Sequence, residues 1–114
     1  MRMWGVNPEC LCRNHLLGEH LEAHMFRGTI VAGKRTNGYL KNKLVVLGKI
    51  KERHDILVKE MLRRGMNHKS PLEKFNEGIG GIIDIKENEK ELIKRCKDCR
   101  KRFIDKKVFK PFML

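Results

Sequence analysis

The most regular pattern of apolar and polar positions lies between residues 47 and 64. Ile50, Leu57 and Met61 fall on one side of a helical wheel with 3.6 residues per turn, and most of the charged residues fall on the other side. Two arginines then precede Gly65, the usual combination of a basic last turn and a glycine that ends a helix. The pattern predicts an amphipathic helix over about residues 47–64.

Two further helices are predicted, one on each side of this stretch. Asn7 can cap free backbone N–H groups and Pro8 suits the first helical turn, so a helix is expected from there to about Arg27. Between residues 87 and 105 a second apolar stripe recurs at helical spacing and indicates another helix; its members are Leu92, Cys96, Cys99 and Phe103.

The remaining segments are typical of connections. Residues 28–43 hold three glycines together with Lys34 and Arg35, as expected of a basic loop. The run Ile82–Ile85 could form a strand, but a single strand cannot form a sheet, and the tail 106–114 is basic and aromatic. Residues 1–114 are therefore predicted to form a single all-α domain, a compact bundle of about three helices with basic connecting loops.

The charge balance indicates a polyanionic partner. With 26 Lys and Arg against 14 Asp and Glu, the formal charge is +12, and a compact body with this excess repels itself unless a polyanion neutralises it. No apolar run approaches the ~18 residues that a membrane span needs, and neither a myristoylation pattern nor a secretory signal is visible. We therefore expect nucleic acid as the partner, no membrane contact, and a cytoplasmic location, associated with a nucleoid or nucleus, without secretion.

Two carboxylates and an imidazole share one face of the first predicted helix. His15, Glu19 and Glu22 are spaced i, i+4 and i+7, and Gly18 beside them leaves room for a close approach. One interpretation is a solvated acidic stripe that pairs with arginines. The other is an acid/base site, because partial burial raises the pKa of a carboxylate, and carboxylates kept in a DNA-binding face oppose the field that attracts DNA.

Other histidines offer a less specific signal. His20 and His24 are four residues apart, but Leu21 follows His20 where the zinc-protease motif HExxH needs a glutamate. We expect them to lie at the surface or to contact phosphate; a metal-dependent nuclease that uses them with a carboxylate is an alternative. His54 lies in the apolar stripe of the second helix and is predicted to be a core histidine with a hydrogen-bond partner.

The four cysteines allow three interpretations. Buried thiols are favoured, since Cys96 and Cys99 already belong to an apolar stripe. A four-sulfur zinc site from Cys10, Cys12, Cys96 and Cys99 requires a helix that begins later than Pro8, because Cys10 and Cys12 otherwise point in nearly opposite directions. A disulfide is the third interpretation, although a reducing cytosol disfavours it.

The chain terminus is a further candidate nucleophile. An α-amino group has a reference pKa of about 7.7–8.0 against about 10.4 for lysine, so a larger fraction of it is neutral at pH 7. Positive surroundings enlarge that fraction further. Because Arg2 is bulky, we expect Met1 to be retained and to carry the free amine.

Two short motifs resemble a known family. The run from Cys12 to Glu22 (CRNHLLGEHLE) and the run from Leu62 to Leu72 (LRRGMNHKSPL) are similar to the pyrimidine-dimer DNA glycosylases of the phage endonuclease V type, especially to their shorter relatives. The likeness covers residues 1–73, so that residues 74–114 form a divergent C-terminal helix and basic tail. The chain departs from the phage proteins at Leu21 and Met25, where they carry arginines, and Arg27 can compensate for one of these.

The resemblance implies a monomeric all-α repair enzyme for damaged double-stranded DNA, with no metal and no organic cofactor. It would be an N-glycosylase with an associated lyase activity at abasic (AP) sites, in which the Met1 amine attacks the sugar and Glu22 assists. Gly18 and Glu19 would support the site, and the expected DNA-binding residues are Arg2, Arg13, His15, Arg27, Lys34, Arg35 and Lys69. The alternative is a non-enzymatic basic helical module that binds nucleic acid, with or without a zinc staple.

Overall fold

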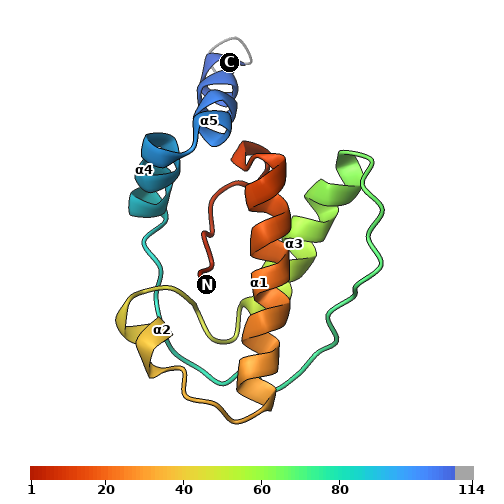
Figure 1. The fold of residues 1–114 in the computed structure, drawn as a ribbon, viewed down its shortest axis with the longest axis vertical. Coiled ribbons are helices and arrows are strands. Elements are labelled where there is room, and N and C mark those ends of the chain that lie inside the picture. The colour runs from red at the N-terminus through yellow and green to blue at the C-terminus, as the bar shows by residue number, and fades with distance from the viewer. Residues whose placement is uncertain (110–114) are drawn as a thin grey trace.

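The computed structural model describes residues 1–109 of the 114 and shows an all-α fold (Figure 1). In chain order its elements are a 3-10 turn η1 (Pro8–Cys10) and the helices α1 (Arg13–Val31), α2 (Asn37–Lys41), α3 (Ile50–Arg63), α4 (Ile85–Arg95) and α5 (Lys97–Phe109). The all-α prediction is confirmed, with five α-helices in the described part instead of about three. None of these helices has the length and apolar character needed to cross a membrane. Most of the predicted basic tail, residues 110–114, lies outside the described residues.

The first long helix begins later than predicted. Asn7 does act as a cap, since its side chain accepts a hydrogen bond from Glu9 N, but the turn that it caps ends at Cys10. Leu11 and Cys12 then adopt extended backbone, and the Cys12 sulfur accepts a hydrogen bond from His15 N to cap α1. The prediction of one helix from Asn7 onward was therefore wrong, because the cysteine provides the cap of the long helix.

The predicted basic loop 28–43 is also partly helical. α1 continues to Val31. Gly33, two residues later, has a φ of +70° and lets Lys34 N donate to Thr29 O at 3.0 Å, which closes the helix end in a Schellman motif. The short helix α2 follows, and its Tyr39 ring meets the Phe26 ring edge to face at 5.2 Å. Apolar anchoring of this kind explains why a glycine-rich basic segment is ordered.

The amphipathic helix predicted over residues 47–64 is confirmed as α3. Its residues Ile50, Leu57 and Met61 are buried, and it ends before Gly65, whose φ is +81°. The start of α3 is capped from far along the chain, because the Glu77 carboxylate accepts hydrogen bonds from the backbone N–H groups of Gly48, Ile50 and Lys51. This distant cap places the helix start three residues later than expected.

The predicted helix 87–105 is two helices. Asp84 caps α4 by accepting a hydrogen bond from Glu87 N, and extended backbone at Cys96 (φ −120°, ψ 108°) separates α4 from α5. Arg100 bridges the break by donating to the carbonyl groups of Ile93 and Lys94. The predicted stripe nevertheless packs in one core cluster, because Leu92, Cys99 and Phe103 are buried there and Cys96 packs against it. The run Ile82–Ile85, which could have formed a single strand, forms none in the described chain, where only an isolated bridge joins Leu47 and Gly80.

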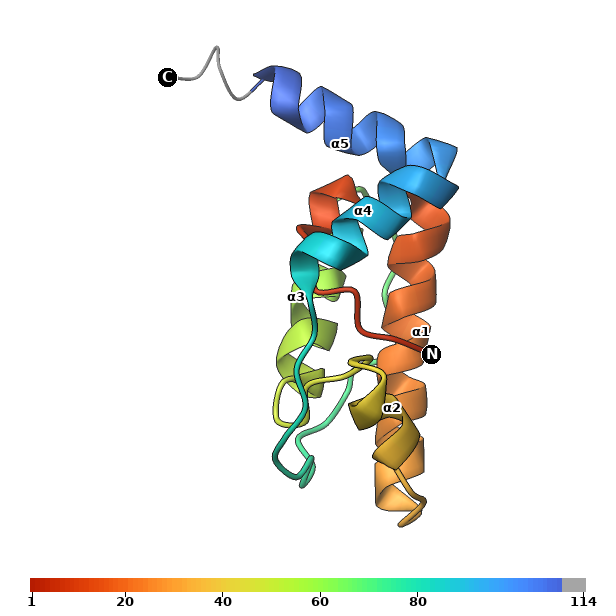
Figure 2. The same cartoon turned by 90° about the vertical axis from the view of Figure 1, so that its left-hand side faces the viewer.

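The N-terminal segment runs between two core clusters and is fixed on both sides. Met3 belongs to the cluster around Phe26, and Trp4 belongs to the cluster of Leu92 and the cysteines. Met3 N donates to Leu44 O at 2.6 Å, and the buried Asn88 side chain donates to Trp4 O at 2.8 Å. Figures 1 and 2 show this segment beside α1, with α4 and α5 lying toward the N-terminal end of α1. The chain terminus is thereby held next to the face of α1 that the sequence analysis singled out.

Candidate active site

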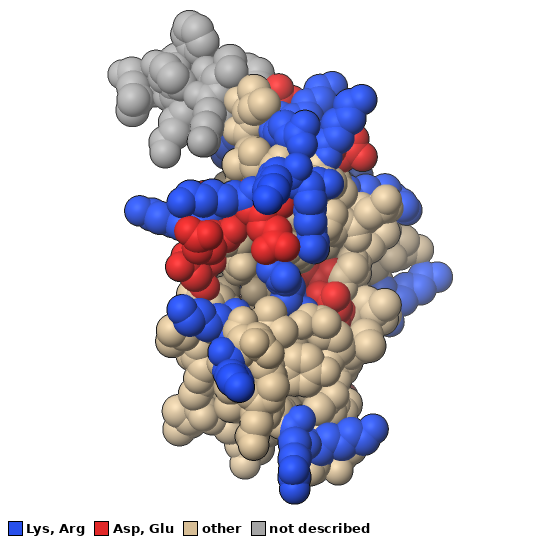
Figure 3. Space-filling model, turned by 60° about the vertical axis from the view of Figure 1, so that its left-hand side comes forward, with Lys and Arg blue, Asp and Glu red and all other residues tan. Residues whose placement is uncertain are grey.

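A pocket of about 310 Å³ lies between the N-terminal segment, the first half of α1 and the end of α4. The structure brings six of the predicted site residues together in its wall: Met1, Arg2, His15, Gly18, Glu19 and Glu22. Three further residues complete it: Trp4, Asn14 and Arg95. Figure 3 shows acidic side chains with lysine and arginine side chains gathered around them on one face of the molecule. The pocket wall itself combines two carboxylates, Glu19 and Glu22, with the basic side chains of Arg2 and Arg95, which fits the acid/base interpretation of the sequence.

Glu22 is positioned by the start of the chain. Its Oε2 accepts a hydrogen bond from Arg2 N at 3.2 Å, which joins residues 20 positions apart. This contact places the carboxylate one residue from the Met1 amino group, and both residues line the pocket. The two groups that the resemblance assigns to the reaction therefore line the same pocket.

Arg2 and Arg95 enclose the chain's single tryptophan. The Arg2 guanidinium lies 4.3 Å and that of Arg95 5.1 Å from the centre of the Trp4 ring. Both arginines also contact Glu91, at 3.4 Å and 3.2 Å respectively. Neither Trp4 nor Arg95 was among the predicted site residues; a lone tryptophan near the terminus was the available signal, whereas nothing in the helical periodicity marks Arg95.

Glu19 makes a buried ion pair at the floor of the site. The carboxylate is 3% exposed and receives two hydrogen bonds from Arg53 of α3, at 2.6 Å and 3.0 Å. A bidentate pair of this kind joins α1 to α3 and fixes the Glu19 side chain. Arg53 is one of the charged residues of the predicted helix 47–64, and no spacing along the chain indicates Glu19 as its partner.

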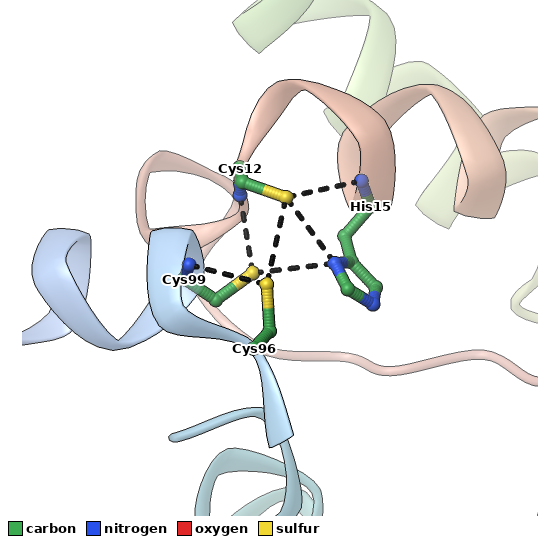
Figure 4. A group of neighbouring side chains, drawn as sticks. All are labelled: Cys12, His15, Cys96 and Cys99. Carbon is green, nitrogen blue, oxygen red and sulfur yellow. Dashed lines mark hydrogen bonds between the residues drawn. The ribbon is translucent and has the colours of Figure 1, made fainter. Parts of the chain in front are cut away.

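His15 contacts the pocket and a group of cysteines. Its Nδ1 lies 3.2 Å from Cys12 Sγ and 3.5 Å from Cys99 Sγ (Figure 4). Burial lowers the pKa of His15, Arg95 lowers it further, and Glu22 opposes them. The donor atoms of Cys12, His15, Cys96 and Cys99 are close enough to share a metal ion, whereas Cys10 is outside this group. All four cysteines of the chain are free thiols, and burial raises the pKa of Cys99 to about 12.

A protein-family comparison matches residues 1–74 to the pyrimidine dimer DNA glycosylase family. The chain belongs to this family. The matched range contains α1, α3 and every pocket residue except Arg95, and it ends within one residue of the boundary expected from the sequence. Comparison with curated proteins and with solved structures finds no match. Membership of the glycosylase family implies action on damaged DNA.

The opposite side of α1 in this glycosylase carries a cluster of histidines. His20 is only 9% exposed, and its ring packs against those of His24, His54 and His68. The expectation that His20 lies at the surface was wrong, because α3 and the segment around Ser70 cover it. Burial and the neighbouring imidazoles lower the pKa of His20 to about 4.

The prediction that His54 is a core histidine with a hydrogen-bond partner is confirmed. It is 1% exposed, with Nε2 at 3.2 Å from Ser70 O and Nδ1 at 2.9 Å from an Asp55 carboxylate oxygen. Ser70 O also lies 3.0 Å from His24 Nε2 and 2.9 Å from His68 Nε2. His20, His54 and His68 form a second group whose nitrogen atoms could share a metal ion.

The other predicted DNA-binding residues of the glycosylase lie away from the pocket. Arg13 is exposed and precedes Glu22 by nine positions, which at about 100° per residue places it on the other side of α1. Arg27 lies 5.8 Å from the Phe75 ring, and Lys34 and Arg35 are exposed beyond the end of α1. Lys69 is exposed between His68 of the histidine cluster and Ser70, whose carbonyl oxygen contacts that cluster. Their contact with DNA stays a prediction, and only Arg2 and His15 of the set line the pocket.

Proposed function

We propose that this family member is a DNA-repair N-glycosylase with an associated AP lyase activity on pyrimidine-dimer lesions, with the Met1 amine as nucleophile and Glu22 as the assisting carboxylate. The observation that carries the proposal is the 3.2 Å hydrogen bond from Arg2 N to Glu22 Oε2, within a pocket that both of these residues line. This contact holds the Glu22 carboxylate one residue along the chain from the Met1 amine. It therefore supports the assignment of the nucleophile to Met1 and of the assisting carboxylate to Glu22.

The proposed chemistry needs only these two groups and water. The neutral amine forms a bond to the sugar carbon C1′ as the bond from C1′ to the base breaks, and the base leaves with the bonding electrons. The Glu22 carboxylate stabilises the positive charge that develops on the sugar and then accepts a proton from the attached amine. Opening of the sugar ring gives an imine, loss of a C2′ proton expels the 3′ phosphate, and water releases the amine.

Basic residues outside the pocket are proposed to hold the DNA backbone. α1 has 19 residues and is therefore about 28 Å long, which corresponds to roughly eight base pairs of duplex. In this proposal Arg2 and His15 contact phosphates beside the lesion, while Arg13, Arg27, Lys34, Arg35 and Lys69 contact more distant ones. Gly18 leaves space for the backbone to approach, since a Cβ added there would meet nothing within 4 Å, and Glu19 supports the pocket floor.

Borohydride trapping tests the nucleophile. Borohydride should reduce the imine to a stable covalent adduct on a duplex with an abasic site, and peptide mass spectrometry should place the adduct on the Met1 nitrogen. Two residues added before Met1 should abolish trapping, because each displaces the amine by roughly 3.5 Å, whereas the same two residues added after Leu114 should not. An adduct on a lysine, or trapping that survives the N-terminal addition, would exclude the Met1 amine.

The same assay separates the enzyme from a non-enzymatic binding module. A protein that only binds DNA would show salt-dependent affinity without strand cleavage on either a dimer-containing or an abasic duplex. Cleavage of the dimer-containing duplex supports the proposed glycosylase, and cleavage of the abasic duplex alone supports a lyase without base release.

A further inference from the structure

We propose that Cys12, His15, Cys96 and Cys99 form a structural zinc site that fastens the C-terminal helices to the start of α1. The four side chains come from two segments 84 positions apart, one with the spacing Cys-x2-His and the other with Cys-x2-Cys (Figure 4). Their donor atoms all lie within 4.8 Å of one another. Three sulfurs and one imidazole nitrogen are a ligand set typical of closed structural zinc sites.

Three of the six distances between donor atoms lie close to those around a tetrahedral ion. Zinc–sulfur bonds of about 2.3 Å and a zinc–nitrogen bond of about 2.0 Å put neighbouring donors at roughly 3.5–3.8 Å across a tetrahedral angle. Cys12 Sγ and Cys96 Sγ are 3.9 Å apart, and His15 Nδ1 lies 3.2 Å and 3.5 Å from the sulfurs of Cys12 and Cys99. A disulfide needs about 2.05 Å between sulfurs, so this arrangement matches a shared ion better than a covalent bridge.

Backbone hydrogen bonds support the sulfurs as metal ligands. Cys12 N donates to Cys99 Sγ at 3.2 Å, His15 N donates to Cys12 Sγ at 3.4 Å, and Cys99 N donates to Cys96 Sγ at 3.4 Å. Each of the three sulfurs therefore accepts a backbone N–H bond, which orients the ligand and stabilises its negative charge. Three thiolates, a neutral imidazole and Zn²⁺ carry a net charge of −1, which suits a chain with an excess of +12.

The local backbone is shaped around the same four residues. The extended conformations of Cys12 and Cys96 interrupt what would otherwise be continuous helical patterns, and both residues lie at helix boundaries. The break at Cys96 directly follows Arg95, which lines the pocket, and His15 lines it as well. A zinc ion here would therefore fix two walls of the pocket from outside it, without contacting substrate.

Metal content of the full-length protein tests the site. Protein dialysed against excess zinc and then freed of loose metal should hold one zinc per chain, and cobalt substitution should give the intense visible bands of a tetrahedral cobalt–thiolate centre. Cys96→Ser should lose at least about nine-tenths of the bound metal. Cys10→Ser is the matched control, since Cys10 is a buried cysteine two residues from Cys12 but outside the group, and it should retain the zinc.

His15→Cys offers a variant that should keep the metal. It would provide four sulfurs, so zinc binding should persist while the cobalt bands shift toward those of a four-thiolate centre. Zinc removal from the wild-type protein should lower its melting temperature by roughly 10 °C or more. Wild-type protein that takes up no zinc or cobalt, or equal metal loss in Cys10→Ser and Cys96→Ser, would overturn the proposal.

Discussion

The side of α1 that carries His15, Gly18 and Glu22 opens onto a pocket, whereas the side that carries His20 and His24 packs against α3 and the segment around Ser70. On the packed side one carbonyl oxygen lies within 3.2 Å of nitrogen atoms from three histidines, so these rings use their polar atoms within the fold. On the open side, the Glu22 carboxylate has a backbone partner and also faces the pocket. A cluster of ionisable residues is therefore a better guide to chemistry when its polar groups remain accessible.

The largest effect is expected from Glu22→Gln, which changes the open side only. The glutamine amide keeps an oxygen that can accept from Arg2 N, so the fold and DNA affinity should be unchanged or the affinity slightly higher, because a negative charge leaves a basic face. Base release should fall by roughly 10²–10³-fold, since the charge that stabilises the sugar cation is lost. Single-turnover cleavage of a dimer-containing duplex measures this rate of base release.

Glu73→Gln is the control for this substitution. Glu73 is exposed in the segment after the histidine cluster, and its replacement makes the same change in net charge. It should leave the rate of base release unchanged. If both variants lose activity equally, the effect comes from net charge, and if neither does, Glu22 has no part in the reaction.

The buried His20 on the packed side predicts that the free energy of unfolding decreases as the pH falls. The pKa of His20 is lowered from 6.5 to about 4 in the folded chain, by burial first and then by His54, His24 and His68. Between these pH values the unfolded chain binds more protons, so the free energy of unfolding should decrease as the pH falls below 6.5 and should level off below about 4. The loss from this one residue should be about 3 kcal/mol.

Urea unfolding of wild type and His20→Gln at a series of pH values measures this contribution. The glutamine stays neutral, so the variant should lose less stability than the wild type between pH 6.5 and 4. Groups that do not interact with His20, including the proposed zinc ligands, titrate alike in both proteins and cancel in the difference, which reports His20 together with its coupling to His24, His54 and His68. Identical pH profiles would show that His20 is not held neutral by the fold.

The smallest effect concerns two glycines of α1. Gly18 and Gly28 are both helical, and a Cβ added at either would meet nothing within 4 Å, but only Gly18 lines the pocket. Replacement of either by alanine should raise the free energy of unfolding by up to about 1 kcal/mol. Gly18→Ala alone should also reduce cleavage several-fold, because its methyl group occupies space that DNA needs; equal activity of the two variants would contradict a close approach at Gly18.

Local patterns were sufficient to predict the helical class, α3 and the shared face of His15, Glu19 and Glu22. They failed where distant residues decide the structure. A sulfur atom caps α1 in place of Asn7, and the apolar stripe continues through Cys96 although the backbone does not. Arg53 reaches Glu19 and Arg95 reaches the pocket from other helices, and no spacing along the chain encodes those contacts.

Hydrogen bonds between the two ends of the described chain also bear on how it folds. Asn88 donates to Trp4 O across 84 positions, and Arg102 donates to Glu9 O across 93. Because the core around Trp4 needs Leu92, Cys99 and Phe103, which are synthesised much later, the N-terminal segment cannot complete its packing until those residues have left the ribosome. Such contacts raise the average sequence separation above that of simple helical bundles, and folding should be correspondingly slower.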